Sequence, residues 1–203
     1  MLAFTPSPGS VWTTAFLDVN TFARHTPWLH TPMRLYANEG ISLFAVLLLA
    51  GWWSARTRDS ATAMAAAAWA PLGMLIALAV NQPVVAVVGE TRPYATLANI
   101  LVLADRTTDP SFPSDHATMA GAVTAALWIA DRRLGLTSAV AAVVMAFARV
   151  YIGAHYPHDV LTGLALGALI GAGGSYLTRH LLTTAIQGLT GTRLRLLLTT
   201  APR

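Results

Sequence analysis

The chain has 203 residues, enough for one domain, but 55% of them are hydrophobic and only 11% are charged, against about a quarter charged in soluble domains. All thirteen basic residues are arginines and cysteine is absent, which excludes Schiff-base lysines, disulfides, thiolate catalysis and cysteine zinc sites. The net charge of +4 falls in short clusters, so nucleic-acid binding is a poor hypothesis. We predict a membrane protein, and no cleavable signal peptide because the first arginine is Arg24.

The N-terminal region, residues 1–37, mixes aromatic side chains with charged ones over residues 11–37. This mixture is typical of helices that lie at a membrane interface. Pro27 and Pro32 should each break a helix. We therefore expect one or two interfacial helices before the first apolar stretch.

Five apolar stretches without a charged side chain follow. They are Gly40–Ala55, Ala61–Val80, Ala117–Ala130, Leu134–Ala148 and Val160–Leu177. A spanning helix needs about 20 residues, which the second and fifth stretches supply directly and the others reach with flanking polar residues. The pattern predicts an all-α, polytopic membrane bundle of about six helices with its core at residues 38–178. A soluble helical protein is the alternative, but it would lack amphipathic helices to face water.

Two prolines and an arginine-containing tail complete this outline. Pro71 should kink the second stretch, and Pro83 should end or bend it. Beyond the fifth stretch, Arg179, Arg193 and Arg195 lie among leucines. We expect residues 179–203 to form an amphipathic C-terminal tail on the membrane surface.

Two polar segments, residues 81–115 and 149–159, separate the stretches and, with five spans, lie on one side together with the N-terminal region. The opposite side carries eight arginines and two aspartates, whereas the side with the two segments carries five arginines and seven acidic residues. Basic residues near span ends favour the cytoplasm. The two polar segments should therefore face the extracytoplasmic side of the cell membrane.

Two predicted helix starts in these segments carry side chains that could bind phosphate and attack it. Ser114 follows Pro113 and precedes an apolar helix, which is an N-cap position, and the free amides of such a helix start bind phosphate. Pro157 suits the first turn of the fifth stretch, with His155 just before that helix and Asp159 within its first turn. The carboxylate would accept a hydrogen bond from one imidazole nitrogen and leave the other free to attack.

Arg92 and Arg149 supply planar, permanently charged groups that match phosphate oxygens. With His116 they complete a plausible phosphoryl-transfer site that needs no metal. His155 is the better nucleophile because Asp159 can orient it, and the other histidine would protonate the leaving oxygen. A helix start disfavours the charged form of His116, but a bound phosphate dianion would restore its proton.

Three motifs resemble the signature of the type-2 phosphatidic acid phosphatase superfamily. They are Arg92-Pro93, then Pro113-Ser114-Asp115-His116, then Arg149 followed by His155 and Asp159. The resemblance implies a six-helix membrane phosphatase that forms a phosphohistidine on His155, oriented by Asp159. It also implies that His116 acts as acid and base. Arg92, Ser114 and Arg149 would bind phosphate, and we include Asp115 among the substrate-binding residues.

Two positions depart from the usual motifs: Val85 replaces a lysine, and Asp115 replaces a glycine. Both departures resemble the branch of the family that hydrolyses undecaprenyl diphosphate. In that branch, Phe-Pro-Ser-Asp-His and a glutamate shortly before Arg-Pro recur, here Phe112–His116 and Glu90–Pro93. Arg106 is a candidate for the phosphate contact that the lysine would make. Glu90 and Asp115 are also candidates for contacts with the site residues themselves rather than with the substrate.

A metal site is the main chemical alternative. His155, His158 and Asp159 could ligate zinc together with His116, but the nearby arginines would repel a cation. We therefore expect no metal and no cofactor. His158, beside a proline, could instead be structural or face the substrate.

The predicted function is hydrolysis of undecaprenyl diphosphate to undecaprenyl phosphate and phosphate. Phosphatidate, phosphatidylglycerol phosphate or a shorter prenyl diphosphate are alternative substrates. A non-enzymatic anion transporter or membrane scaffold is the alternative of another class. The expected partners are the lipid-linked phosphate substrate and membrane lipids, without nucleic acid, and the sequence indicates no protein partner.

Overall fold

The computed structural model describes residue 7 and residues 9–200. The remaining residues, 1–6, 8 and 201–203, contain the ends of the predicted N-terminal region and C-terminal tail, which therefore lie outside the described residues. Within the described part the chain is helical and contains no strand, so the all-α prediction is confirmed. The helices are α1 (Val11–His25), η1 (Pro27–Leu29), α2 (His30–Glu39), α3 (Ile41–Thr57), α4 (Ala61–Val88), α5 (Pro93–Thr96), α6 (Asp115–Ala130), α7 (Arg132–Tyr151), α8 (Pro157–Leu189) and α9 (Arg195–Leu198).

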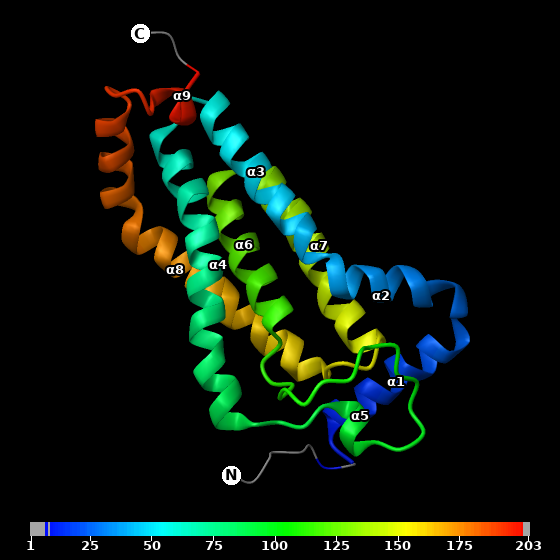
Figure 1. The fold of residues 1–203 in the computed structure, drawn as a ribbon. Coiled ribbons are helices and arrows are strands. Elements are labelled where there is room, and N and C mark those ends of the chain that lie inside the picture. The colour runs from blue at the N-terminus through cyan, green and yellow to red at the C-terminus, as the bar shows by residue number, and fades with distance from the viewer. Residues whose placement is uncertain (1–6, 8, 201–203) are drawn as a thin grey trace.

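Five long helices, α3, α4, α6, α7 and α8, run between two ends of the molecule (Figure 1). Four of them contain a whole predicted apolar stretch, and α3 contains all of Gly40–Ala55 except Gly40, which is its N-cap. In the described part of the chain, α4 with α5, α7 and α8 are long and apolar enough to cross a membrane. A fourth span results if α2 and α3, which are bent by 57° at their junction, are counted as one. The protein is a multi-pass membrane protein.

The N-terminal helices α1 and α2 lie across one end of the bundle (Figure 1). The break predicted at Pro27 is present, between α1 and η1. The break predicted at Pro32 is wrong, because Pro32 is the third residue of α2. The first turn of a helix has no partner for its N–H groups, so a proline there removes no hydrogen bond.

Helix α4 continues through both of its prolines and ends at Val88, so Pro83 does not end it. Prolines are tolerated in membrane helices when neighbouring groups satisfy the freed carbonyls. The helix instead ends at Gly89, whose φ of 59° is left-handed, a conformation that glycine adopts without steric cost. This turn directs the next residue, Glu90, into the interior, where its side chain is 1% exposed.

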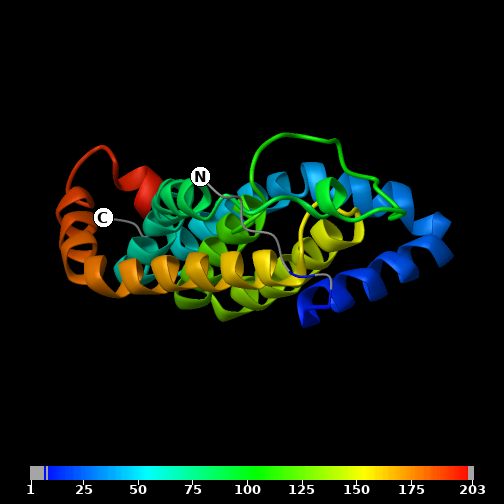
Figure 2. The same ribbon diagram turned by 90° about the horizontal axis from the view of Figure 1, so that it is seen from below.

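Helix α8 is longer than the predicted fifth stretch and reaches Leu189, so the start of the predicted tail at residue 179 lies inside a helix. It changes direction towards its C-terminal end (Figures 1 and 2). The following segment returns to α3: Trp52 Nε1 donates to the carbonyl of Leu197 at 2.9 Å, and Arg56 Nε donates to the carbonyl of Leu196 at 2.8 Å.

Helices α6 and α8 approach each other at backbone distance. A Cβ placed on Gly167 would lie 1.9 Å from the carbonyl oxygen of Thr118, and one on Gly171 would lie 2.3 Å from that of Ala122. Small residues allow helices to pack this closely in membranes. The same pair is joined at its starts, where the amide of Ser114 donates to the carbonyl of Asp159 at 3.1 Å. The contact therefore fixes the starts of both helices relative to each other.

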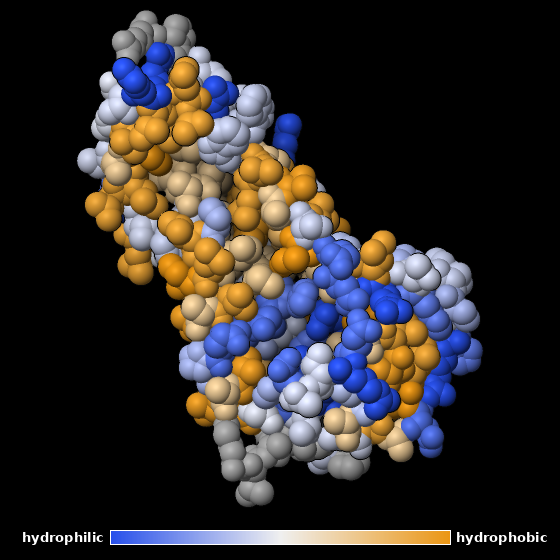
Figure 3. Space-filling model, viewed as in Figure 1, coloured by the Kyte–Doolittle hydropathy of each residue, from blue (hydrophilic) through white to orange (hydrophobic). Residues whose placement is uncertain are grey.

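The surface has an apolar middle. Hydrophobic side chains cover the central part of the face in Figure 3, and hydrophilic ones gather at the ends, most of them around α5 and the loop that follows it. Leu75, Val143 and Leu169 are among the large apolar side chains that are more than half exposed. An exposed apolar belt of this kind matches the hydrocarbon core of a bilayer.

Candidate active site

A cavity of about 570 Å³ lies at the end of the bundle near α1, α2 and α5. Its lining includes five of the residues expected to act: Arg92, Asp115, His116, Arg149 and His155. The polar segments 81–115 and 149–159 thus meet at one end of the molecule, as the count of spans predicted. Histidines 116 and 155, which are separated by a whole helical hairpin, line one cavity.

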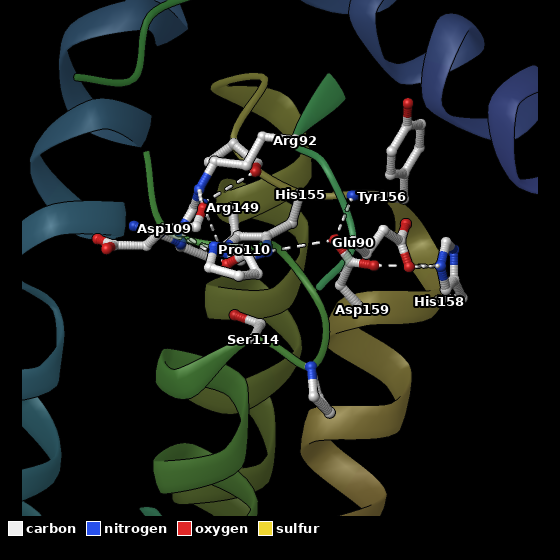
Figure 4. Close-up of polar contacts among 12 residues, drawn as sticks. Glu90, Arg92, Asp109, Pro110, Ser114, Arg149, His155, Tyr156, His158 and Asp159 are labelled. Atoms are coloured by element: carbon white, nitrogen blue, oxygen red, sulfur yellow. Dashed lines mark hydrogen bonds and ion pairs between the residues drawn. The ribbon is translucent and has the colours of Figure 1, made fainter. Parts of the chain in front are cut away.

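His155 lies in the short connection between α7 and α8 and is 3% exposed. Its Nε2 lies 3.3 Å from Nη1 of Arg92 and 3.2 Å from Nη2 of Arg149, while its Nδ1 lies 3.3 Å from Oδ2 of Asp159 (Figure 4). A guanidinium group only donates hydrogen bonds and a carboxylate only accepts them. The contacts therefore place the proton on Nδ1 and leave the Nε2 lone pair directed into the cavity.

Asp159 is fully buried in the first turn of α8 and does not line the cavity. Its Oδ2 accepts a hydrogen bond from the backbone amide of Tyr156 at 2.9 Å as well as facing His155. This hydrogen bond from the backbone amide is part of a capping box, in which the N-cap residue and the third helical residue bond to each other at the helix start. The side chain that orients the imidazole is thus itself held by the helix cap, and the predicted meeting of these two residues is present.

The two arginines are held by backbone carbonyls rather than by carboxylates. Arg92 donates to the carbonyls of Asp109 at 2.9 Å and Ala154 at 3.1 Å, and Arg149 donates to that of Ala37 at 3.2 Å. No salt bridge joins either guanidinium to a carboxylate among the described residues. Two uncompensated cations beside a cavity make it a site for an anion.

These charges act on both histidines of the cavity. Burial lowers the pKa of His155 well below its ordinary value, and the charges of Arg149 and Arg92 lower it further. Burial also lowers the pKa of His116 to about 4, again with help from the two arginines. Both imidazoles are therefore neutral at pH 7, which suits a nucleophile but requires a bound anion before the second one can act as an acid.

Ser114 has the backbone conformation of the residue before α6, but its side chain forms no cap hydrogen bond. Its Oγ is fully buried without a hydrogen-bond partner among the described residues, and it is not part of the cavity lining. The position that the sequence predicted is correct, whereas the expected contact of this hydroxyl with substrate remains a prediction.

The side chain of Asp115 lines the cavity and is tied to α4. Its Oδ1 accepts hydrogen bonds from Nδ2 of Asn81 at 2.7 Å and from Nε2 of Gln82 at 3.0 Å. These two amides were not expected at the site from the sequence. The signal available was a pair of polar residues directly after an uncharged stretch, which does not indicate a partner by itself.

Val85, which stands where the usual first motif has a lysine, lies in the cavity wall. Val85 lines the cavity together with Ala86, so this wall is apolar. Arg106, the candidate replacement, places its guanidinium 5.6 Å from the centre of the Tyr94 ring and is not part of the lining.

One group of side chains in the described part of the chain has the spacing of metal ligands: Glu90, His158 and Asp159, whose ligand atoms lie within 4.8 Å of one another. His116 and His155, which the zinc alternative also required, are not members of this group. The cavity with its two arginines is a separate, anion-binding environment.

Comparison with known proteins places this site in a family. The model of the PAP2 superfamily matches residues 66–183. Undecaprenyl-diphosphatase BcrC of Bacillus subtilis is 28% identical over 156 residues, which cover 77% of this chain and 78% of the relative. Decaprenylphosphoryl-5-phosphoribose phosphatase of Mycobacterium tuberculosis is 46% identical over 74 residues, covering 36% of this chain and 40% of the relative.

A solved structure agrees at the level of the fold. The crystal structure of Aquifex aeolicus LpxE superposes with a TM-score of 0.60 at 22% identity, covering 83% of this chain and 96% of that one. The chain belongs to the PAP2 superfamily and is a membrane phosphatase. The resemblance to this family and the expectation of a phosphate hydrolase are confirmed.

Proposed function

We propose that the protein hydrolyses undecaprenyl diphosphate to undecaprenyl phosphate and inorganic phosphate through a phosphohistidine on His155. The observation that carries the mechanism is the pair of contacts on that imidazole. Its Nε2 faces Arg92 and Arg149 in the cavity, and its Nδ1 faces a buried carboxylate. An imidazole in this setting has an unprotonated Nε2, a fixed tautomer and two cations that can transfer their hydrogen bonds from this nitrogen to a bound phosphate.

In the first step, oxygens of the terminal phosphate accept hydrogen bonds from Arg92 and Arg149. Nε2 of His155 forms a bond to phosphorus while the bond from phosphorus to the bridging oxygen breaks. The electron pair of that bond remains on the leaving lipid phosphate, to which His116 can donate a proton. Asp159 stabilises the imidazolium that forms, because Nδ1 keeps its proton.

In the second step, water attacks the phosphohistidine. His116, now neutral, accepts a proton from this water as the bond between nitrogen and phosphorus breaks. The lone pair returns to Nε2 and inorganic phosphate leaves the arginines. The two arginines stabilise the charge of the transferred group in both steps.

The lipid substrate is supported by the relatives and by the motifs. BcrC is named an undecaprenyl-diphosphatase, and Glu90–Pro93 and Phe112–His116 match the pattern of that branch. The apolar belt of the bundle offers an isoprenoid chain the same environment as the bilayer. Its phosphate would reach the cavity at the end of the bundle.

A substrate panel on purified protein in detergent tests this proposal. We expect the highest kcat/KM for undecaprenyl diphosphate among that lipid, phosphatidate, phosphatidylglycerol phosphate and farnesyl diphosphate. The His155→Ala variant should release no phosphate, whereas His180→Ala, the same change at an exposed histidine, should keep full activity. Preference for a glycerolipid would contradict the substrate, and phosphate release by His155→Ala would contradict the mechanism.

We further propose that the cavity faces the extracytoplasmic side, on the basis of the arginine-rich opposite end. The absence of cysteine allows single-cysteine labelling at two exposed positions, Thr108 near the cavity and Arg193 at the opposite end. In intact cells a membrane-impermeant maleimide should label Thr108→Cys, and it should label Arg193→Cys only after permeabilisation. The reverse pattern would place the cavity in the cytoplasm.

A further inference from the structure

A second imidazole lies on the far side of Asp159 from the cavity. Nε2 of His158 is 3.2 Å from Oδ1 of Asp159 and 3.0 Å from Oε2 of Glu90. The two oxygens of Asp159 thus face different imidazoles, one facing His155 and the other His158 (Figure 4). A continuous line of contacts leads from Glu90 through His158 and Asp159 to the proposed nucleophile.

Both carboxylates in this line are removed from water. Glu90 is 1% exposed and Asp159 is 0% exposed. Neither contacts an arginine within salt-bridge distance in the described residues, and His158 is the one basic group that reaches both. Burying two carboxylates together is costly unless a cation or donor lies between them. Nε2–H of His158 occupies that position.

The ring of His158 is held by aromatic side chains. The rings of Trp12, Phe112 and Tyr156 have their centres 5.4, 5.5 and 5.7 Å from it, and Tyr156 is stacked at 23°. The groups that face this imidazole and can titrate are therefore Glu90, Asp159 and the Tyr156 phenol. Three elements far apart in sequence, α1, the loop before α6 and the start of α8, thus fix the ring in one place.

We propose that Glu90 and His158 are a positioning pair that keeps the Asp159 carboxylate aligned on Nδ1 of the proposed nucleophile. Glu90 Oε2 holds Nε2 of His158 at 3.0 Å and so orients the ring, and this imidazole edge faces Oδ1 of Asp159 at 3.2 Å. Neither residue lines the cavity, so neither is expected to touch substrate. This inference rests on the proposed phosphohistidine mechanism, in which Asp159 acts through His155.

The predicted signature is a loss of kcat without a loss of substrate binding. His158→Phe keeps a ring among the aromatic neighbours but removes the donor, and we expect kcat to fall about 10- to 100-fold, as for other groups that orient a reacting ligand. KM should stay within about twofold because Arg92 and Arg149 are untouched. His158→Gln retains an N–H donor and should recover part of the loss.

A double-mutant cycle separates this role from general destabilisation. Glu90→Gln should lower kcat by less than His158→Phe, and the double variant should be no slower than His158→Phe alone, because both residues act through one carboxylate. His30→Phe is the matched control, since His30 also contacts an aromatic ring, Tyr151, outside the cavity. It should retain activity, and thermal unfolding should show that the compared variants are folded.

Four outcomes decide the proposal, and phosphohistidine is measured in the wild type first. If the wild type forms none, the underlying mechanism fails rather than the pair. If the wild type forms it but His158→Phe and Glu90→Gln keep wild-type kcat, the pair is not a positioning device. Additive losses would also overturn it. Activity abolished by a chelator and restored by zinc would instead make Glu90, His158 and Asp159 a metal site, the other arrangement that their spacing permits.

Discussion

Arg58 and Arg149 lie at opposite ends of the bundle and have different partners. At the end near α9, Asp131 accepts hydrogen bonds from Arg58, from Ser54 Oγ at 2.7 Å and from the amide of Arg133 at 2.9 Å. At the cavity end, Arg149 is half-buried, with its buried Nε unpartnered among the described residues, and Nη2 faces the unprotonated nitrogen of His155. Arg58 thus has a carboxylate partner, whereas Arg149 has none among the described residues.

The presence or absence of a carboxylate partner distinguishes a structural arginine from one that is available to bind an anion. A guanidinium paired with a carboxylate gains little from a further anion, whereas an unpaired one beside a cavity gains a charge-assisted hydrogen bond. Position at a helix end is common to Arg58 and Arg149 and does not separate them. What separates them is the partner, which only the folded structure supplies.

The largest expected effect is at the nucleophile. His155→Gln removes the attacking nitrogen but keeps a polar side chain, and we expect kcat to fall by about 10⁴-fold or more, the scale seen when a catalytic imidazole is lost or misoriented. Steady-state phosphate release with undecaprenyl diphosphate measures it. A variant that retained a tenth of the activity would show that another group attacks phosphorus.

The comparison between the two ends predicts unequal effects of the same substitution. Arg149→Ala removes a donor from the cavity and should lower kcat/KM by about 10²- to 10³-fold. Arg58→Ala removes a half-exposed guanidinium from Asp131, which keeps its hydrogen bonds from Ser54 and from the amide of Arg133. This change should leave kcat/KM within about twofold, with a loss of at most about 1 kcal/mol in the free energy of unfolding. Equal effects in the same phosphate-release assay would remove the distinction drawn here.

The arginines also predict a proton linked to anion binding. His116 has a pKa of about 4 in the free protein and is neutral at pH 6. A bound dianion raises this pKa, so binding should take up protons. Titration calorimetry with tungstate in buffers of different ionisation enthalpy measures this uptake, which His116→Gln should reduce. Equal uptake by the variant and the wild type would assign the proton to another group.

A smaller effect should follow from loosening the contact between α6 and α8. Gly167→Ala places a Cβ 1.9 Å from a backbone oxygen, and we expect a loss of about 1–3 kcal/mol in stability with a parallel fall in kcat, because both helix starts move. Gly173 in the same helix has nothing within 4 Å, so Gly173→Ala should be neutral or stabilising. Thermal unfolding and phosphate release on both variants make the comparison, and equal Tm values would contradict it.

The parts of the site that the sequence could predict are those encoded locally. His155 and Asp159 are four residues apart across a helix start marked by Pro157, so a local turn of the chain before α8 is enough to bring them together. The contact of Asp115 with Asn81 and Gln82 joins residues more than thirty positions apart. Amide side chains follow no metal-like or catalytic spacing, so only the packing of α4 against α6 brings them together.

The error at Pro32 has a similar origin. Pro32 was expected to break a helix because proline removes a donor, but a first-turn position needs no donor. The fifth apolar stretch ends at Leu177 because charged residues follow, whereas the helix that contains it, α8, continues to Leu189. Composition marks where a chain can enter lipid, whereas helix ends depend on caps and packing.

The central claim is that phosphorus is bonded to one imidazole nitrogen during turnover. The most direct test is to mix the protein with substrate labelled in its terminal phosphate, quench within milliseconds in alkali and locate the label by peptide mass spectrometry. We expect an acid-labile, alkali-stable phosphate on His155 that disappears on a chase with unlabelled substrate. Label on another residue, or full turnover with no labelled protein at any quench time, would contradict it.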